Sequence, residues 1–596
     1  MTAAIQTIWA ELVATSLADG GVTRCVISPG SRSTPLVAAL AREPRLELVT
    51  LIDERAAAFF ALGAARATGM PLALVCTSGT AAAHYLPAIV EASLAGVPLL
   101  ALTADRPPEL HGCGAAQTID QIKMYGDFVR GAIDLGAPCD GELALRSVRR
   151  KILQALTLAR GPAPGPVHVE LPLRKPLEPA APTTDAERSL ARLAGQLAGD
   201  ARIAPPGLAP DPGAVAEIAA AIAHEPFGVI LAGALPAAFA ASRAAVFALA
   251  ARAGYPILAE AGSQLRFGPR PDGVVFVDHF DLIPPDALPV PRLVLQLGSE
   301  PVAAAWPAWA ARLAASGAAR WVLAGHTWHD ADSSARGVVL GDVAAAIEAV
   351  GHALAARLPA PRTPSGAAAH SWREAEARAA RAIDIALDSH PRSEAAMLRA
   401  AIDAVPAGAA IQLGNSLPIR VVDQVCSGGA PRVVLTQRGA AGIDGLIASA
   451  AGATCAGQPV LLVLGDVSFA HDLGGLIAAR SAHAPLAILV IDNRGGQIFA
   501  GLPVARAQPT AAFERHWITA PELDPAAIAT ALGLRATTAA SPGGAAAAIA
   551  TALDTPGVTV IHAPVSASGA HDVRRTALEH CSVSIPLRAA RGGTND

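Results

Sequence analysis

The sequence predicts an α/β protein with three doubly wound parallel-sheet domains. Short apolar runs, each fit for a buried strand, alternate with helical segments, and polar or glycine-rich turns follow the runs. Proline-rich stretches at 173–213 and 358–365 interrupt this pattern, and we interpret the first as a linker. Since 596 residues exceed a single core, we expect three domains, over 1–185, 205–355 and 366–596.

Composition excludes several classes of protein. With 16% charged residues and a net charge of −4, the chain is a poor partner for nucleic acid. Apolar stretches are all broken before eighteen residues, so we expect no membrane span. The first residues lack a basic region and favour an amphipathic helix over a signal peptide. Seven scattered cysteines without a CxxC pair indicate reduced thiols in a cytoplasmic protein, with neither zinc nor disulfides.

The first domain repeats one strand–turn–helix unit. Strands are expected at 22–27, 46–52, 72–76 and 97–102. The turns after them read SPGSRSTP, DER, TSGT and TADRP, and each leads into a helix. Because helix N-termini attract anions, these strand ends are candidate sites for a negatively charged ligand.

A strand–helix–strand unit dominates the third domain. Apolar runs at 460–464 and 486–491 flank a helix expected near 473–481. Asp466 directly follows the first run and Asn493 the second, so both fall at the carboxyl edge of neighbouring parallel strands.

These two side chains offer oxygen ligands of the kind that Mg²⁺ prefers, and the backbone of Gly495 offers another. The alternative is that the acidic residues only cap helices. Asp466 and Asn493 are 493 − 466 = 27 residues apart, and this frame resembles the thiamine diphosphate signature. Val467 and Arg494 depart from the signature, in which Gly and Asn are usual. The metal ligands that the resemblance implies are Asp466, Asn493 and Gly495.

The three-domain plan resembles that of thiamine-diphosphate decarboxylases, with pyrimidine, central and diphosphate domains. Within that group the motifs are similar to those of the 2-succinyl-5-enolpyruvyl-6-hydroxy-3-cyclohexene-1-carboxylate (SEPHCHC) synthases of menaquinone biosynthesis. The matching pieces lie in the first and third domains: SPGSRSTPL (28–36), DERAAAFFALGAA (53–65), TSGTAAAHYLPAIVEA (77–92), ADRPPEL (104–110), QTIDQ (117–121), GNSLPIR (414–420), RGAAGIDG (438–445), GDVSFAHDLGGL (465–476) and NRGGQIF (493–499). The central domain matches weakly.

The resemblance implies a reaction and an assembly. The cofactors would be thiamine diphosphate and Mg²⁺ or Mn²⁺. The substrates would be 2-oxoglutarate, which loses carbon dioxide, and isochorismate, which accepts the succinyl group in a 1,4-addition. The active sites would lie between the pyrimidine-binding domain of one subunit and the diphosphate domain of another, in a homodimer or homotetramer.

Glu54 is the catalytic candidate. The resemblance implies that it hydrogen-bonds the aminopyrimidine ring and so promotes removal of the thiazolium C2 proton. Its place between an apolar strand and an apolar helix favours burial of the carboxyl and a raised pKa. The alternative is that Asp53 and Glu54 only complement the helix N-terminus.

Two dicarboxylate substrates require several cations. Arginine suits this need because its planar guanidinium binds carboxylates bidentately. Four arginines lie inside the matching motifs, although a loop arginine is most often simply solvated; the candidates are Arg32, Arg106, Arg420 and Arg438, with neutral hydrogen bonds from Ser31 and Gln117.

Further residues are assigned to the cofactor by resemblance. Ile443 would support the bent cofactor, with core packing as the alternative. Gly465, Ser416 and Ser468 would lie near the diphosphate, and an apolar wall would come from Ile498, Phe499 and Leu502.

The central domain departs from the family pattern. Many relatives carry a substrate-binding lysine where 298–306 reads GSEPVAAAW, and no basic residue stands there. Arg266 and Arg292 are candidates to replace it.

Three rival interpretations stay open. The nearest is another thiamine-diphosphate 2-oxo acid decarboxylase or an acetolactate-synthase-like carboligase, which needs fewer cations. The second is a non-catalytic binding protein that keeps the fold and the cofactor site for regulation, and the presence of Glu54, Asp466 and Asn493 argues against it. A nicotinamide or flavin enzyme would carry GxGxxG after its first strand, where SPGSRS stands instead.

Overall fold

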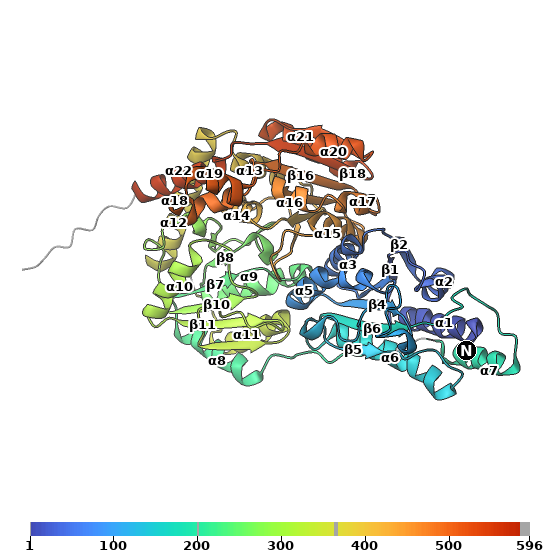
Figure 1. Cartoon of the computed structure of the whole chain (residues 1–596). Helices are drawn as coiled ribbons and strands as arrows, with labels where there is room; N and C mark the ends of the chain where they lie inside the picture. Colours follow the sequence, from blue (N-terminus) through green and yellow to red (C-terminus); the bar gives the residue numbers. More distant parts are fainter. Residues whose placement is uncertain (1, 200–201, 363–366, 584–596) are drawn as a thin grey trace, which may run out of the picture.

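The computed structural model describes residues 2–199, 202–362 and 367–583. It contains three six-stranded sheets, all with parallel pairing, in the orders β2-β1-β3-β4-β6-β5, β12-β11-β10-β7-β8-β9 and β14-β13-β15-β16-β18-β17. Helices cover these sheets, and the three units follow one another along the chain in Figure 1. The predicted α/β class with three doubly wound domains is confirmed.

The first sheet belongs to the blue and cyan part of Figure 1. Its strands are β1 (Arg24–Ile27), β2 (Glu47–Thr50), β3 (Leu72–Cys76), β4 (Leu99–Asp105), β5 (Ala132–Asp134) and β6 (Pro166–Pro172). Its helices are α1 (Ala3–Asp19), α2 (Thr34–Arg42), α3 (Glu54–Thr68), α4 (Thr80–Ala83), α5 (Leu86–Ala95), α6 (Glu142–Arg160) and α7 (Asp185–Leu197). The four predicted strands are present, and the last extends to Asp105, so this carboxylate lies on the strand itself.

The linker expected over 173–213 contains the helix α7. Thr184 caps it, with its side chain accepting from the Glu187 N–H while the Glu187 side chain returns to the backbone of the cap. Leu190 and Leu193 are buried in the same apolar cluster as α1 and α6. The linker interpretation is therefore wrong for the middle of this stretch. The capping box and the buried leucines stabilise a helix there despite the proline-rich residues on either side.

The central sheet lies in the green part of the ribbon. Its strands are β7 (Gly228–Ala232), β8 (Ile257–Ala259), β9 (Phe276–Val277), β10 (Leu293–Leu297), β11 (Ala319–Ala324) and β12 (Gly337–Leu340). The helices are α8 (Pro212–His224), α9 (Arg243–Ala253), α10 (Trp306–Ala315) and α11 (Val343–Arg357), and α12 (Ala367–Ser389) leads to the third sheet. Part of the second proline-rich break, residues 363–366, lies outside the described residues.

The third sheet carries the strand–helix–strand unit. Its strands are β13 (Ala410–Leu413), β14 (Val433–Thr436), β15 (Val460–Gly465), β16 (Leu486–Asp492), β17 (Arg535–Thr538) and β18 (Val558–Pro564). The helices are α13 (Glu394–Asp403), α14 (Leu417–Val425), α15 (Leu446–Ala453), α16 (Asp466–His471), α17 (Gly475–Ala479), α18 (Val504–Ala507), α19 (Thr510–Phe513), α20 (Pro525–Ala531), α21 (Pro542–Asp554) and α22 (Gly569–Val583). The helix expected near 473–481 is α17, and the short α16 before it begins at Asp466 itself.

The first and third domains meet where α3 packs on α15 (Figure 1). Glycines bring the two helix backbones into contact. A Cβ on Gly63 would lie 1.9 Å from the Ser449 carbonyl oxygen, and one on Gly452 would lie 1.9 Å from the Phe60 carbonyl oxygen. The helix that begins with Glu54 is thus held directly against the domain that carries Asp466.

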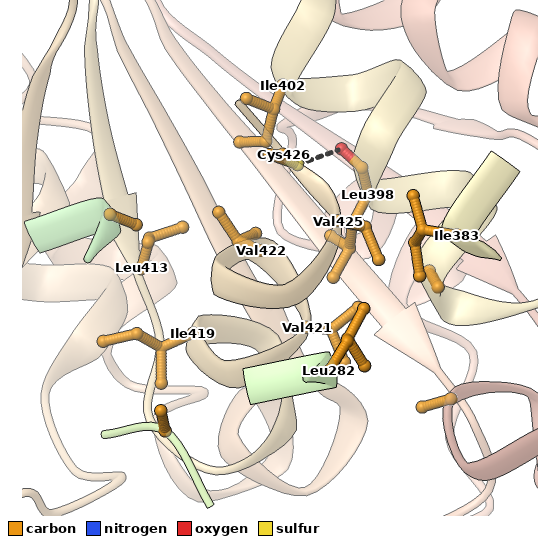
Figure 2. Packing of buried hydrophobic residues seen from close by; sticks show 14 of the residues in the cluster. Leu282, Ile383, Leu398, Ile402, Leu413, Ile419, Val421, Val422, Val425 and Cys426 are labelled. Carbon is orange, nitrogen blue, oxygen red and sulfur yellow. Dashed lines mark hydrogen bonds between the residues drawn. The ribbon is translucent and has the colours of Figure 1, made fainter. Parts of the chain in front are cut away.

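The central and third domains share one apolar core, shown in Figure 2. Val421, Val422 and Val425 of α14 lie there between Leu282 of the central domain and Leu398 of α13. All five side chains are at most 2% exposed. This core fixes the position of α13 and α14, whose N-termini face the carboxyl edge of the third sheet.

All seven cysteines lie within the described ranges and are free thiols, as expected. Within the same ranges, no helix combines the length and the apolar character needed to cross a membrane.

Candidate active site

The predicted metal ligands come together at the carboxyl edge of the third sheet. Strands β15 and β16 are parallel neighbours, with Gly465 paired to Ile491. Asp466 therefore follows one strand beside the point where Asn493 follows the other. The Asp466 carboxylate accepts hydrogen bonds from the backbone N–H of Gly495 at 2.7 Å and of Val467 at 2.8 Å.

This cluster fits a divalent cation. The Asn493 side chain is 5% exposed, and its Oδ1 is buried without a hydrogen-bond partner. Burial raises the pKa of Asp466 to about 6 despite its two backbone hydrogen bonds, and a nearby cation would offset that cost. Gly495 has φ +109°, and a Cβ there would lie 2.2 Å from the Ile518 carbonyl oxygen, so only glycine fits.

The candidate ligands are one carboxylate, one amide oxygen and one backbone carbonyl. Within the described parts of the chain, no group of three or more His, Cys, Asp or Glu side chains is placed to hold a metal. A site with few charged ligands suits Mg²⁺, which usually shares its coordination with phosphate and water.

Glu394 is a site residue that the sequence did not reveal. It opens α13, is 1% exposed, and its Oε2 accepts a 3.0 Å hydrogen bond from Nδ2 of Asn493. Burial, and then the negative charge of Asp466, raise the pKa of Glu394 to about 7, although the hydrogen bond from Asn493 lowers it. The two partners are 99 residues apart, and Ser393-Glu394 alone reads only as an ordinary helix start.

A second group of predicted residues lies on two neighbouring loops of this sheet. Asn415 ties the loops together, since its Nδ2 donates to the Gln437 carbonyl at 2.8 Å and to the Gly442 carbonyl at 2.7 Å. Ser416 follows with φ +73° as the residue before α14. Ile443, half-buried, lies on the second loop.

Arg420 and Arg438 lie close together beside these loops. Arg420 donates to the Ser416 carbonyl at 2.7 Å, and Arg438 donates to Oδ1 of Asn415 at 3.3 Å. Burial, and then the positive charge of Arg420, lower the pKa of the Arg438 guanidinium. Two guanidiniums held near each other form a site for an anion.

The first domain holds a second arginine pair. Arg32 is 5% exposed and donates to the Leu173 carbonyl at 2.6 Å, while its Nε is buried without a partner. Burial, and then the positive charge of Arg106, lower the pKa of Arg32. Arg106 donates to Ser78 and, at 3.2 Å, to Oε1 of Gln117, so three of the four predicted residues of this group gather here. Ser31, the fourth, is exposed.

Glu54 is the first residue of α3, and the Asp53 side chain caps the helix by accepting from Arg55 N at 2.9 Å. Arg55 lies 3.7 Å from Asp472 of the third domain, which anchors this turn. The Glu54 side chain itself is only half-buried. The expected burial of this carboxyl is therefore incomplete among the residues that the structure describes.

The other predicted cofactor residues flank the metal cluster. Gly465 and Ser468 lie at and after the end of β15, and Ser468 is buried. Ile498 is half-buried, whereas Phe499 and Leu502 are 37% and 47% exposed. These apolar side chains lie on an open surface of the single chain.

The suggested replacements for the central-domain lysine are wrong. Arg266 is 1% exposed and donates to the carbonyls of Ala259 and Cys426, which makes it a structural residue. Arg292 precedes β10 and so lies at the opposite end of that strand from 298–306.

The basic residue that lines a cavity with Ala304 and Ala305 is Arg574 of α22. Among the described residues, Arg574 has no hydrogen-bond or ion-pair partner. It lies one helical turn after His571, whose Nε2 is 2.7 Å from the Gln497 carbonyl oxygen.

Comparisons with known proteins agree with this geometry. Residues 9–124 match the family described as "Thiamine pyrophosphate enzyme, N-terminal TPP binding domain", and residues 420–563 match the corresponding C-terminal TPP binding domain. A solved benzoylformate decarboxylase from Polynucleobacter necessarius has the same fold, with a TM-score of 0.69 at 17% identity over 94% of this chain and 98% of that one. The class is that of the thiamine-diphosphate enzymes.

Full-length relatives identify the family within this class. A SEPHCHC synthase from Sorangium cellulosum is 43% identical over 94% of this chain and 93% of its own length. Another from Roseiflexus sp. (strain RS-1) is 39% identical over 86% of this chain and 87% of its own length. The chain belongs to the SEPHCHC synthase family.

Proposed function

We propose that the protein decarboxylates 2-oxoglutarate on thiamine diphosphate and adds the succinyl group to isochorismate in menaquinone biosynthesis. The observation that carries this proposal is the buried cluster of Asp466, Asn493 and Gly495 with its unpartnered amide oxygen, in a chain similar to SEPHCHC synthases over nearly its full length.

The third domain would hold the cofactor. Mg²⁺ or Mn²⁺ would bind the Asp466 carboxylate, the Asn493 amide oxygen and the Gly495 carbonyl. Thiamine diphosphate supplies carbanion stabilisation when it is bound. Its diphosphate would lie beside Gly465, Ser416 and Ser468, and its rings beside the apolar side chains of Ile443, Ile498, Phe499 and Leu502.

Glu54 would act on the cofactor through a hydrogen bond to the aminopyrimidine ring. A carboxyl at this place can hold and return a proton, provided that a facing surface shields it from water. The half-buried position of Glu54 leaves room for such a surface.

The two arginine pairs would bind the substrates. Each substrate is a dicarboxylate, and each pair offers two guanidiniums within one loop group, with Ser31 and Gln117 adding neutral hydrogen bonds near Arg32 and Arg106. No hydrogen bond between described residues joins one pair to the other.

Exposed apolar side chains near both parts of the site support a homodimer, or a homotetramer built from such dimers, with active sites between subunits. Ile52, two residues before Glu54, is 79% exposed, and Phe499 and Leu502, which follow Asn493, are 37% and 47% exposed. Apolar side chains of this size near Glu54 and near Asn493 suit a second copy of the chain.

The test uses purified protein with thiamine diphosphate, Mg²⁺ and 2-oxoglutarate, with and without isochorismate. We expect 2-oxoglutarate consumption and a succinyl adduct of isochorismate, identified by mass. Release of succinic semialdehyde that isochorismate does not alter would instead indicate a simple 2-oxo acid decarboxylase.

A further inference from the structure

A buried carboxylate beside the metal cluster has no basic partner. Glu394 is 1% exposed, and among the described residues no Lys, Arg or His forms an ion pair with it. One oxygen, Oε2, accepts from Asn493, and the other, Oε1, is buried without a partner. Burying a carboxyl in this way is costly, so its contact with Asn493 calls for an explanation.

The contact determines which end of the Asn493 amide is left free to bind a cation. An asparagine side chain can present either its oxygen or its NH₂ group, and only the oxygen binds a cation. Here Nδ2 of Asn493 donates to Oε2 of Glu394 at 3.0 Å. This bond engages the NH₂ end of the amide and leaves Oδ1 as the atom without a partner.

The helix under Glu394 is rigid. Ser393 caps α13 by accepting from Ala396 N at 3.1 Å. Leu398 and Ile402, both 0% exposed, anchor the same helix in the core shared with the central domain (Figure 2). A carboxylate on such a support holds its partner in one orientation.

We propose that Glu394 is a positioning residue that fixes the Asn493 amide with its oxygen toward the metal ion. The inference rests on the proposed metal site at Asp466 and Asn493. Glu394 acts through Asn493 and touches neither substrate nor cofactor.

The test measures Mn²⁺ binding rather than turnover. Free Mn²⁺ is followed by electron paramagnetic resonance in the full-length protein at saturating thiamine diphosphate, and the melting temperature of the metal-free protein is recorded in parallel. The variants are Glu394→Met, Glu394→Asp and Glu394→Gln. Ser393→Ala is the matched control, because it weakens the same helix start without touching Asn493, and Asp466→Ala tests the metal site itself.

We expect Glu394→Met to weaken Mn²⁺ binding about 10- to 100-fold. Its metal-free melting temperature should stay the same or rise, because an unpaired buried carboxyl is removed. Glu394→Asp keeps the charge but shortens the reach, so it too should lose affinity. Glu394→Gln keeps an acceptor oxygen and should retain most of it. Ser393→Ala should lower the melting temperature and leave Mn²⁺ affinity unchanged.

Two results would overturn the inference. One is wild-type Mn²⁺ affinity in both Glu394→Met and Glu394→Asp while Asp466→Ala abolishes binding. The other is a loss of affinity that only follows lost stability, as judged against Ser393→Ala. If Asp466→Ala leaves Mn²⁺ binding intact, the proposed metal site itself is wrong, and the inference fails with it.

Discussion

The two halves of the candidate site are built differently. In the third domain, Asp466 and Asn493 are 6% and 5% exposed, and both are held by hydrogen bonds within one chain. In the first domain, Glu54 is half-buried, and Gln117 and Ser31 are exposed. The Asp466–Asn493 cluster is enclosed within a single chain, whereas the surroundings of Glu54 are left open.

This difference follows from the chemistry proposed for each half. A cation site must be organised before the ion arrives, because the carboxylate and the amide have to converge on one point. A proton-transfer group needs its shielding only when the cofactor is bound. The cation site is therefore organised within one chain, whereas the shielding of Glu54 from water depends on a second surface.

The largest expected effect is on the open half. Glu54→Gln should lower kcat by about 10²- to 10⁴-fold, because it removes the acid–base group while keeping the side-chain size. Steady-state assay of product formation measures this. Thermal unfolding and Mn²⁺ binding should stay close to wild type, since the Glu54 side chain makes no hydrogen bond to any other described residue. Unchanged kcat would exclude the catalytic role of Glu54.

Mixed dimers of two inactive variants test whether Glu54 and Asp466 of one active site come from different subunits. Glu54→Gln and Asp466→Ala subunits are each expected to be nearly inactive. If Glu54 of one subunit faces Asp466 of another, mixed dimers contain one intact site, and random reassembly of equal amounts should recover about a quarter of wild-type activity. The mixture is dissociated, reassembled and assayed beside each variant treated alone. No recovery, with mixed dimers shown by differently tagged subunits, would place both residues in the same chain's site.

The arginine pairs should separate the two substrates. Arg106→Ala and Arg438→Ala should each raise one KM by about 10- to 100-fold, the value of a hydrogen bond from a charged group. We expect the larger rise for different substrates in the two variants, because the pairs lie in different domains. Arg188→Ala is the control, since Arg188 is an exposed arginine whose guanidinium, among the described residues, contacts only its sequence neighbours Thr183 and Asp185. Equal rises of both KM values in both variants would argue against separate substrate sites.

The sequence was sufficient for the elements that local patterns determine. Continuous apolar runs predicted β3 at its observed bounds and β15 and β16 to within one residue, and the Asp466–Asn493 frame placed two candidate ligands at the ends of neighbouring strands. These features are determined by the residues of short stretches of chain and by the geometry of the parallel crossover that joins them.

What the sequence could not supply depends on distant contacts. Glu394 joins Asn493 across 99 residues, and nothing near it in the sequence distinguishes it from a helix cap. Arg574 reaches the cavity beside Ala304 from the last described helix. The burial of Arg266 also depends on distant contacts. The sequence suggested that Arg266 was available to bind substrate, but its guanidinium donates to backbone carbonyls in the interior.

The smallest expected effect concerns the seam between the two halves, where α3 meets α15. Gly63→Ala places a Cβ 1.9 Å from the Ser449 carbonyl oxygen, so the helices must separate, at an expected cost of about 1–3 kcal/mol of unfolding free energy. Gly351→Ala in α11 is the matched control, because no atom lies within 4 Å of its Cβ, and it should stabilise by about 0.5–1 kcal/mol. Denaturant unfolding measures both.

Because α3 begins with Glu54, Gly63→Ala should also lower kcat while leaving Mn²⁺ affinity unchanged, since the metal cluster is complete within the third domain. If Mn²⁺ affinity falls together with kcat, the metal cluster depends on the packing of α3 against α15, and the conclusion that the third domain forms it independently is wrong.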